Sequence, residues 1–227
     1  MTTVAEIINN AKQVLQETGA DGIRWKNAYL VRLLNEFYQA AVQVKPDAFS
    51  VNEPLSLAEG TKQAIPATGL RLLDVIRNTS GMAITVTTRK ALDSGRRTWH
   101  SDPASTAIEQ FTFDELDPTR FYVYPPAAIG AEVEILYSAL PEGHDAALDL
   151  SVVGLEQFKL NDAYAPIATD YILYRAFSID AEHAANLQRA QMHFQAYMQQ
   201  LAGKAQTDMQ ISPNASDGSA NPPRARA

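Results

Sequence analysis

The fold is decided by a change of pattern within residues 27–57, NAYLVRLLNEFYQAAVQVKPDAFSVNEPLSL. In the first part of this stretch, apolar side chains recur at the spacing of one face of an α-helix. Pro46 cannot continue a helix, so a helix is predicted from about Asn27 to Val44. From Ser50 onward, β-branched and aromatic residues are broken by turn residues, which favours strands. The apolar face of the helix consists of Leu30, Leu33, Leu34, Phe37, Ala41 and Val44.

Upstream of this stretch, the sequence predicts another helix. Thr3 can cap its first turn, and Glu6, three residues on, can bond back to the backbone of Thr3, which together make a capping box. Gly19 is the expected end of this helix. Because the connection to the next helix is short, the two helices are expected to form an antiparallel pair. The apolar stripe of the first helix consists of Ile7, Ile8, Ala11, Val14 and Leu15.

Downstream, residues 50–140 are predicted to form strands joined by short turns. Residues 79–81 and 114–118 have the composition of hairpin turns, and a short helix with a loop is expected between Arg89 and Trp99. Strands joined by such short links pair antiparallel, so a sandwich or open barrel is expected and a βαβ fold is not. The predicted strands are residues 51–57, 73–77, 82–88, 108–113, 120–124 and 132–138.

Helical spacing returns near the end of the chain. A third helix is predicted to start at Asn161 or Asp162, and a fourth to end at Gly203, with Asp180 as the hinge between them. The fold class is therefore α+β: a helical bundle from residues 1–48 and 160–205, an inserted antiparallel β domain at 49–159, and a flexible, disordered tail at 206–227. The tail is predicted because residues 206–227 contain almost no large apolar side chains.

Composition excludes several classes of function. The chain has 227 residues and no cysteine, so disulfides and thiolate metal sites are excluded. No apolar stretch approaches the length of about 20 residues that crosses a bilayer, and no secretion signal is evident at the N-terminus. The formal net charge is −7, and the densest basic segment is Arg89-Lys90 with Arg96-Arg97. Tight binding of nucleic acid is therefore not expected.

The sequence predicts no catalytic, metal-binding or cofactor-binding residue. Gly60-Thr61-Lys62 resembles the end of a phosphate-binding loop, but Leu55 stands where the first glycine belongs. Asp114, Glu115 and Asp117 are expected to form a solvated turn, although a glycosidase-like carboxylate pair stays open. The helical spacing of Tyr164, Tyr171, Tyr174 and Phe177 indicates core packing. The histidines, expected to be partly exposed and too far apart on any helix to share a metal, are His100, His144, His183 and His193.

Several short segments, taken together in their order and spacing, match one known family. They are Trp25 with Leu33-Leu34-Asn35; Gly60-Thr61-Lys62-Gln63 with Ile65-Pro66; residues 72–78; Leu92-Asp93 with Trp99-His100; Asp117-Pro118 with residues 121–126; Asp162 with Tyr164; residues 170–176; and residues 180–182. In these segments, over roughly residues 20 to 203, the chain resembles the head-to-tail adaptor (connector) proteins of tailed bacteriophages, related to tail tubular protein A of short-tailed phages.

The resemblance implies a structural virion protein without enzymatic activity or cofactor. About twelve copies would form a ring between the portal protein and the tail nozzle or tube protein, and double-stranded DNA would pass through its lumen without tight binding. Assembly would take place in the host cytoplasm, and no contact with a membrane is expected. The C-terminal tail, with Ile211, Arg224 and Arg226, is the segment expected to dock on a partner. Two alternatives stay open: a carbohydrate-binding or carbohydrate-cleaving β-sandwich protein, and a cytoplasmic helical-bundle interaction protein.

Overall fold

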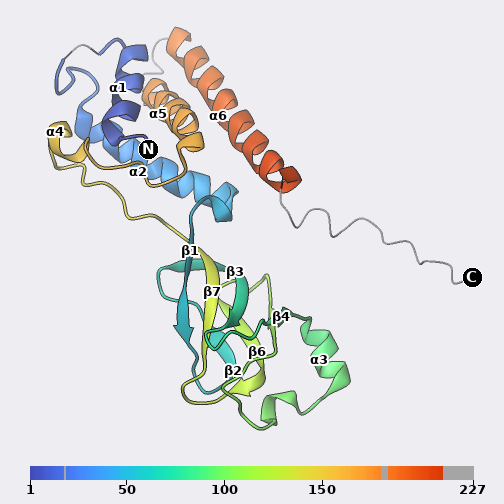
Figure 1. Ribbon diagram of the computed structural model, residues 1–227. Helices are drawn as coiled ribbons and strands as arrows, with labels where there is room; N and C mark the ends of the chain where they lie inside the picture. The colour runs from blue at the N-terminus through green and yellow to red at the C-terminus, as the bar shows by residue number, and fades with distance from the viewer. Residues whose placement is uncertain (18, 180–183, 212–227) are drawn as a thin grey trace, which may run out of the picture. The chain divides into compact units, whose positions relative to one another are not determined.

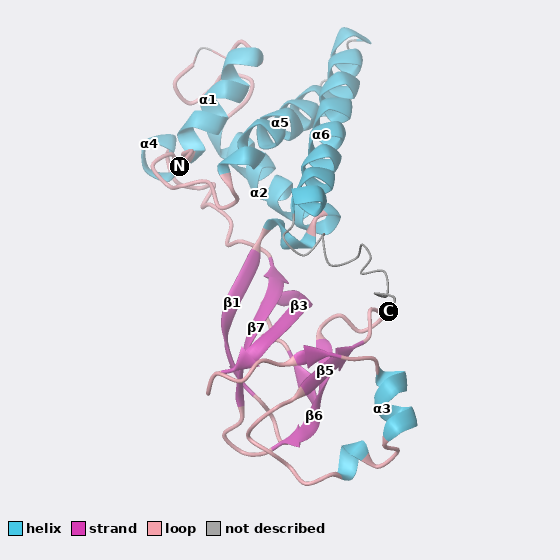
Figure 2. Cartoon of the chain, turned by 45° about the vertical axis from the view of Figure 1, so that its right-hand side comes forward, coloured by secondary structure: helices cyan, strands magenta, loops and turns pink. Residues whose placement is uncertain are grey.

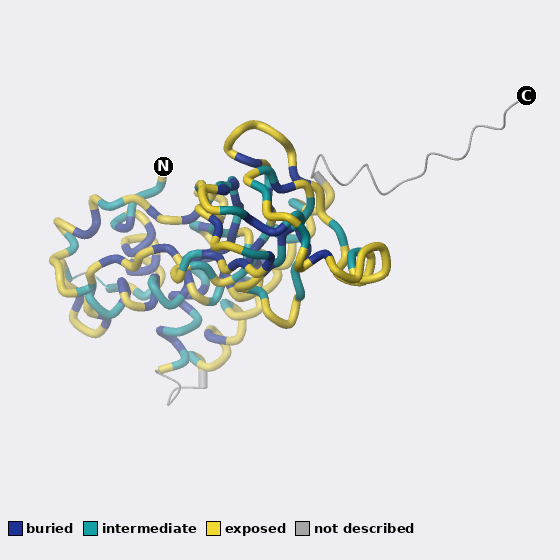
Figure 3. Tube along the Cα trace, turned by 90° about the horizontal axis from the view of Figure 1, so that it is seen from below, coloured by how far each residue is buried: buried dark blue, intermediate teal, exposed yellow. Residues whose placement is uncertain are grey.

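The protein has an α+β fold that divides into two compact units. The computed structural model describes residues 1–17, 19–179 and 184–211 (Figure 1). Residues Met1–Phe37 and Gly143–Ala227 form one unit, here called the helical unit, and Tyr38–Glu142 form the other, the β unit. All strands belong to the β unit (Figure 2). Along the chain, buried stretches alternate with exposed ones (Figure 3).

The helical unit contains α1 (Val4–Val14), α2 (Asn27–Val44) as far as Phe37, the short α4 (Leu150–Val153), the 3-10 turn η3 (Asp162–Tyr164), α5 (Ala165–Ile179) and α6 (Ala184–Ile211). The predicted capping box is confirmed, since the Thr3 side chain accepts from the Glu6 backbone and Glu6 accepts from the Thr3 backbone. The predicted bounds of α2 are confirmed. Within the described chain, no helix combines the length and the hydropathy that crossing a membrane requires.

Helix α1 ends earlier than predicted. It stops at Val14 and not at Gly19, because Gln16 takes a left-handed conformation with φ of 56°. The Glu17 N–H then reaches back to the Lys12 carbonyl oxygen at 2.9 Å, the pattern of a Schellman cap. A glutamine therefore performs the terminating role that the sequence pattern assigned to a glycine.

The core of the helical unit is aromatic. The ring of Phe37 lies 5.8 Å from the ring of Tyr171, 6.3 Å from that of Phe158 and 6.3 Å from that of Tyr197. The rings of Tyr171 and Tyr197 are 5.2 Å apart. The prediction of core packing is confirmed for Tyr164, Tyr171 and Phe177, which are buried, whereas Tyr174 is half-buried.

Helix α6 is longer than predicted. It continues through Gly203 to Ile211, so residues 206–211, which were assigned to the flexible tail, are helical. An ion pair between Lys204 and Asp208, one turn apart, and a hydrogen bond of 2.8 Å from Thr207 Oγ1 to the Gly203 carbonyl oxygen span the predicted break. The predicted hinge at Asp180 and the tail residues 212–227 lie outside the described residues.

The β unit contains two sheets. One has the order β1 (Ser50–Ser56), β7 (Glu132–Ala139), β3 (Gly69–Asn78), and all its pairs are antiparallel. The other has the order β2 (Gly60–Ala64), β6 (Arg120–Ala127), β5 (Gln110–Phe113), β4 (Thr85–Val86). Strands β4 and β5 pair in parallel, which corrects the expectation of purely antiparallel pairing. The unit also holds η1 (Pro46–Ala48), α3 (Arg89–Gly95) and η2 (Trp99–Ser101).

Both sheets contribute to a single apolar cluster. The cluster includes Leu72 and Val75 from β3, Val133 and Ile135 from β7, Phe111 from β5, and Phe121 and Val123 from β6.

Two strands differ from the prediction. Strand β2 was not predicted, because Thr61 is its one β-branched residue; the strand is held instead by its pairing with β6. The predicted strand at 82–88 is reduced to the two residues of β4.

The division into units differs from the predicted domain bounds. Residues 143–159 had been assigned to the inserted domain, but they belong to the helical unit. Backbone hydrogen bonds hold them there: Val4 N–H donates to the Glu156 carbonyl at 3.0 Å, and Phe158 N–H donates to the Thr2 carbonyl at 2.9 Å. These contacts join segments more than 150 residues apart, and local composition carries no signal of them.

Candidate functional site

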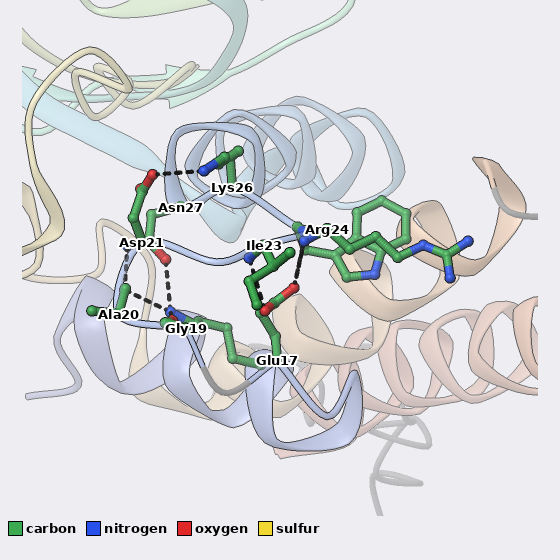
Figure 4. Close-up of polar contacts among 10 residues, drawn as sticks. Glu17, Gly19, Ala20, Asp21, Ile23, Arg24, Lys26 and Asn27 are labelled. Carbon is green, nitrogen blue, oxygen red and sulfur yellow. Dashed lines mark hydrogen bonds and ion pairs between the residues drawn. The ribbon is translucent and has the colours of Figure 1, made fainter.

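The loop between α1 and α2 is organised by an ionised carboxylate (Figure 4). Glu17 accepts hydrogen bonds from the backbone N–H groups of Ile23 at 2.8 Å, Arg24 at 2.9 Å and Trp25 at 3.1 Å. The hydrogen bonds from Ile23 and Trp25 are the main causes that lower the pKa of Glu17 to about 2. The side chain is therefore an anion at neutral pH, and it fixes the backbone of three consecutive residues.

A buried ammonium group fixes the other half of the same loop. Lys12 is 7% exposed, and its Nζ donates to the carbonyl oxygens of Gly19 and Ala20, both at 2.9 Å, and to Asn27 Oδ1 at 3.0 Å. Asn27 in turn donates from Nδ2 to the Ala20 carbonyl at 3.0 Å. Burying an ammonium group is costly unless oxygens replace its water, and here three oxygens do so.

The shape of the loop requires a glycine and exposes an apolar side chain. Gly22 has φ of +82°, and a Cβ at this position would lie 2.0 Å from the Trp25 carbonyl oxygen. Immediately after it, Ile23 is 80% exposed. The Arg24 guanidinium lies 5.9 Å from the centre of the Trp25 ring. Glu17 and residues 19–27, here called the α1–α2 loop, thus expose an apolar side chain on a backbone that hydrogen bonds hold in place.

The α1–α2 loop was not identified from the sequence as a candidate site. Its signals were a lysine, Lys12, next to the apolar stripe of the first helix, and an acidic residue, Glu17, shortly before two glycines. Neither signal is specific by itself. The hydrogen bonds that join them run across seven or eight residues of irregular chain, where no periodic pattern exists.

The acidic residues of the β5–β6 turn serve the turn itself. Asp114 Oδ1 accepts from the Leu116 N–H at 3.0 Å, and Asp117 lies 3.8 Å from Arg120. A depression of about 330 Å³ next to this turn is lined by both carboxylates and cations, among them Glu115 and Lys90. Across the described residues, no set of three or more His, Asp or Glu side chains is arranged to hold a metal ion.

Three histidines of the described chain have a polar side chain next to the ring. His100 Nδ1 is 2.7 Å from Thr61 Oγ1, and His193 Nδ1 is 2.8 Å from Asp170 Oδ1. His144 was expected to be partly exposed, but its side chain is fully buried and its Nδ1 lies 2.6 Å from Glu156 Oε2. Burial lowers the pKa of His144, although the hydrogen bond with Glu156 acts in the opposite direction.

The backbone of His144 also holds the segment after β7 on α2. Its N–H donates to Asn35 Oδ1 and its carbonyl accepts from Asn35 Nδ2, both at 2.8 Å.

His183 lies outside the described residues, as do two of the predicted docking residues, Arg224 and Arg226. The third, Ile211, is the last residue of α6.

These observations define the class of protein: an α+β chain whose helical unit is interrupted in sequence by a β unit, with a surface loop fixed by charged side chains. Residues 2–217 match the family model described as SU10 adaptor protein, so the chain belongs to this family. It is a structural adaptor of a bacteriophage virion that acts between head and tail and interacts with portal and tail components. The family is not a class of enzymes. No curated protein matches the chain.

Proposed function

We propose that about twelve copies of the chain form a ring between the portal and the tail, related in its role to tail tubular protein A of short-tailed phages. The observation that supports this proposal is the match to the adaptor family over residues 2–217, which includes both units. Identical copies joined head to tail close into a ring when the rotation between neighbours divides a full turn. Such a ring encloses a channel for the genome on its way out of the capsid.

The charge of the chain suits a channel through which DNA passes without being held. Each copy carries a formal net charge of −7, so a ring of copies repels phosphate groups wherever carboxylates face the lumen. The basic segment with Arg89, Lys90, Arg96 and Arg97 is exposed, but Arg96 is paired with Asp102 at 2.7 Å. Strong binding of duplex DNA by the assembled ring at physiological salt would contradict this part of the proposal.

The C-terminal segment is proposed to dock on the portal. Helix α6 carries the chain to Ile211, and the remaining residues include Arg224 and Arg226, whose guanidinium groups suit carboxylates of a partner. Deleting residues 212–227 preserves α6 and should abolish co-purification with the portal. A double variant, R224A/R226A, should weaken it. Undiminished binding of both variants would refute the docking role.

The copy number is tested by the mass of the complex. Full-length chain is mixed with assembled portal, the complex is purified, and its mass is measured by native mass spectrometry. One adaptor per portal subunit is the expected ratio. A complex with one or two adaptors per portal ring would contradict the proposed ring.

A further inference from the structure

Helix α6 packs on the helical unit through one narrow stripe. Ala190, Tyr197 and Leu201 are almost fully buried, with exposed fractions of 3%, 4% and 0%. His193, on the same stripe, bonds to Asp170 of α5, and its ring lies 5.8 Å from that of Phe177. The three- and four-residue spacing of these positions defines one side of the helix. The rest of the circumference of this helix of 28 residues is left to solvent or to a partner.

A second stripe on α6 is apolar and exposed. Leu187 is 47% exposed, Phe194 42%, Met198 39% and Met209 76%. At about 100° per residue, these four side chains fall within a sector of about 60°. Phe194 is the inner member of the stripe, since its ring also contacts Tyr174 at 5.0 Å. We call these four residues the α6 stripe.

The exposed surface around the α6 stripe carries no charge over the described length of α6. Apart from His193, the charged residues of the helix are Arg189, Lys204 and Asp208. Arg189 lies over the ring of Phe177 at 5.6 Å, and Lys204 pairs with Asp208 and lies 5.7 Å from the ring of Tyr164. All three thus lie toward the packed side of the helix. The solvent side is built from uncharged residues: Gln188, Gln191, Gln195, Gln199, Ala202 and Gln206.

The absence of charge indicates which partner this surface fits. Whichever patch of a neighbouring copy receives the stripe, that patch belongs to a chain with a net charge of −7, and carboxylates on the stripe would face further carboxylates at a cost. The uncharged stripe, about 33 Å long from Leu187 to Met209, adds no like charge to such a contact. An exposed helix that served only to contact water would be expected to alternate charged residues on this side.

We infer that the α6 stripe is a contact between neighbouring copies of this chain, a proposal that rests on the proposed ring and names one of its interfaces. From Leu187 to Met209 the stripe is about 33 Å long, and at a width of about 10 Å it covers about 330 Å², less than half of what a standard interface buries per partner. Two free copies therefore associate weakly through it, and the contact becomes stable when the portal holds the copies side by side. In a closed ring the surface that receives the stripe is a different patch of the neighbour.

Site-specific photo-crosslinking tests the inference. Because the chain has no cysteine, M198C introduces a single thiol, which is labelled with a benzophenone maleimide and irradiated in the full-length chain bound to portal. The matched control is M192C, which lies on the same helix, replaces the same residue type, is 68% exposed, and is turned by about 120° around the axis. The expected result is adaptor–adaptor adducts from M198C, with far fewer from M192C. Equal yields from the two positions, or adducts of M198C with portal alone, would overturn the inference.

A charge variant provides an independent readout. M198E places a carboxylate in the proposed contact and should raise the concentration of chain needed to fill the portal, measured by titration and native mass spectrometry, by about tenfold or more, whereas M192E should leave it unchanged. If M198E and M192E behave alike, the α6 stripe is not the contact. The failure of this inference is distinguishable from that of the proposed ring: a full complement of copies on the portal without adducts at position 198 refutes the stripe alone.

Discussion

A loop of the helical unit and two loops of the β unit are fixed by different chemistry. In the helical unit, the α1–α2 loop is held by the ammonium group of Lys12 and the carboxylate of Glu17. In the β unit, the side-chain amides of Gln63 and Asn78 each hold a loop. Gln63 bonds to both the N–H and the carbonyl of Ala58 at 2.8 Å, and Asn78 bonds to the carbonyl of Ile108 at 2.7 Å and to its N–H at 2.8 Å.

This difference has a physical consequence. Amides do not titrate, so pH leaves the hydrogen bonds of Gln63 and Asn78 unchanged. In the helical unit, by contrast, the pKa values of Glu17 and His144, each of which holds a segment of the chain in place, are lowered. The chain offers a probe for each unit, since Trp25 lies in the helical unit and Trp99 in the β unit. W99F and W25F backgrounds therefore report the two units separately by fluorescence.

The largest effect is expected in the apolar cluster of the β unit. Phe121 is completely buried, and F121A leaves a cavity that should lower the free energy of unfolding by about 3–5 kcal/mol. The measurement is urea unfolding followed by Trp99 fluorescence in the W25F background. F121L, which fills most of the space, should cost clearly less. A loss below about 1 kcal/mol for F121A would mean that this cluster is not what stabilises the unit.

A smaller effect is expected from removing the buried charge of the helical unit. K12M leaves the carbonyl oxygens of Gly19 and Ala20 without their donor and should cost about 1.5–3 kcal/mol, read from Trp25 in the W99F background. The control is K26M, because Lys26 is exposed and pairs with Asp21 at 3.2 Å, so its loss should stay within about 0.5 kcal/mol. Equal costs for the two variants would remove the special role of Lys12.

The third prediction concerns acid sensitivity near neutrality. Because burial lowers the pKa of His144 below its ordinary 6.5, the unfolded chain binds a proton before the folded chain does. The free energy of unfolding should therefore fall as the pH drops below about 6.5. H144Q should flatten this slope in unfolding curves recorded between about pH 7.5 and 5, a range set by the ordinary pKa of histidine. An unchanged slope in H144Q would assign it to other groups.

The smallest effect is expected at Glu17, which is partly exposed. Its folded pKa is about 2 against an ordinary value of 4.5, so its contribution is present above pH 4.5 and is lost as the pH falls toward 2. E17Q should remove this part of the acid dependence and should increase amide hydrogen exchange at residues 23–25. Unaltered exchange in E17Q would show that the carboxylate does not hold the α1–α2 loop.

The sequence predicted what depends on local periodicity and missed what depends on distant contacts. The bounds of α2 and the capping box of α1 follow from neighbouring residues, and both are confirmed. Strand β2 was missed because it exists through its pairing with β6, a segment about 60 residues away. The length of α6 was missed because Gly203 was expected to end the helix, whereas the pair of Lys204 and Asp208 carries the helix on.

The candidate site was the least predictable part. The α1–α2 loop depends on Lys12 of α1 and on Glu17 and Gly22 of the irregular segment after it, and none of these residues is distinctive by itself. The adaptor resemblance came from segments dispersed along the chain, and the family match over residues 2–217 confirms its coarser content. The expected docking residues Arg224 and Arg226 stay predictions, since they lie outside the described residues.

Electron microscopy of purified full-length chain mixed with its portal would show whether this chain is a structural part that joins the portal to the tail. We expect an added ring of density on one face of every portal, with one adaptor for each portal subunit. Portal particles that stay bare at saturating adaptor concentration, while the chain remains folded, would contradict it.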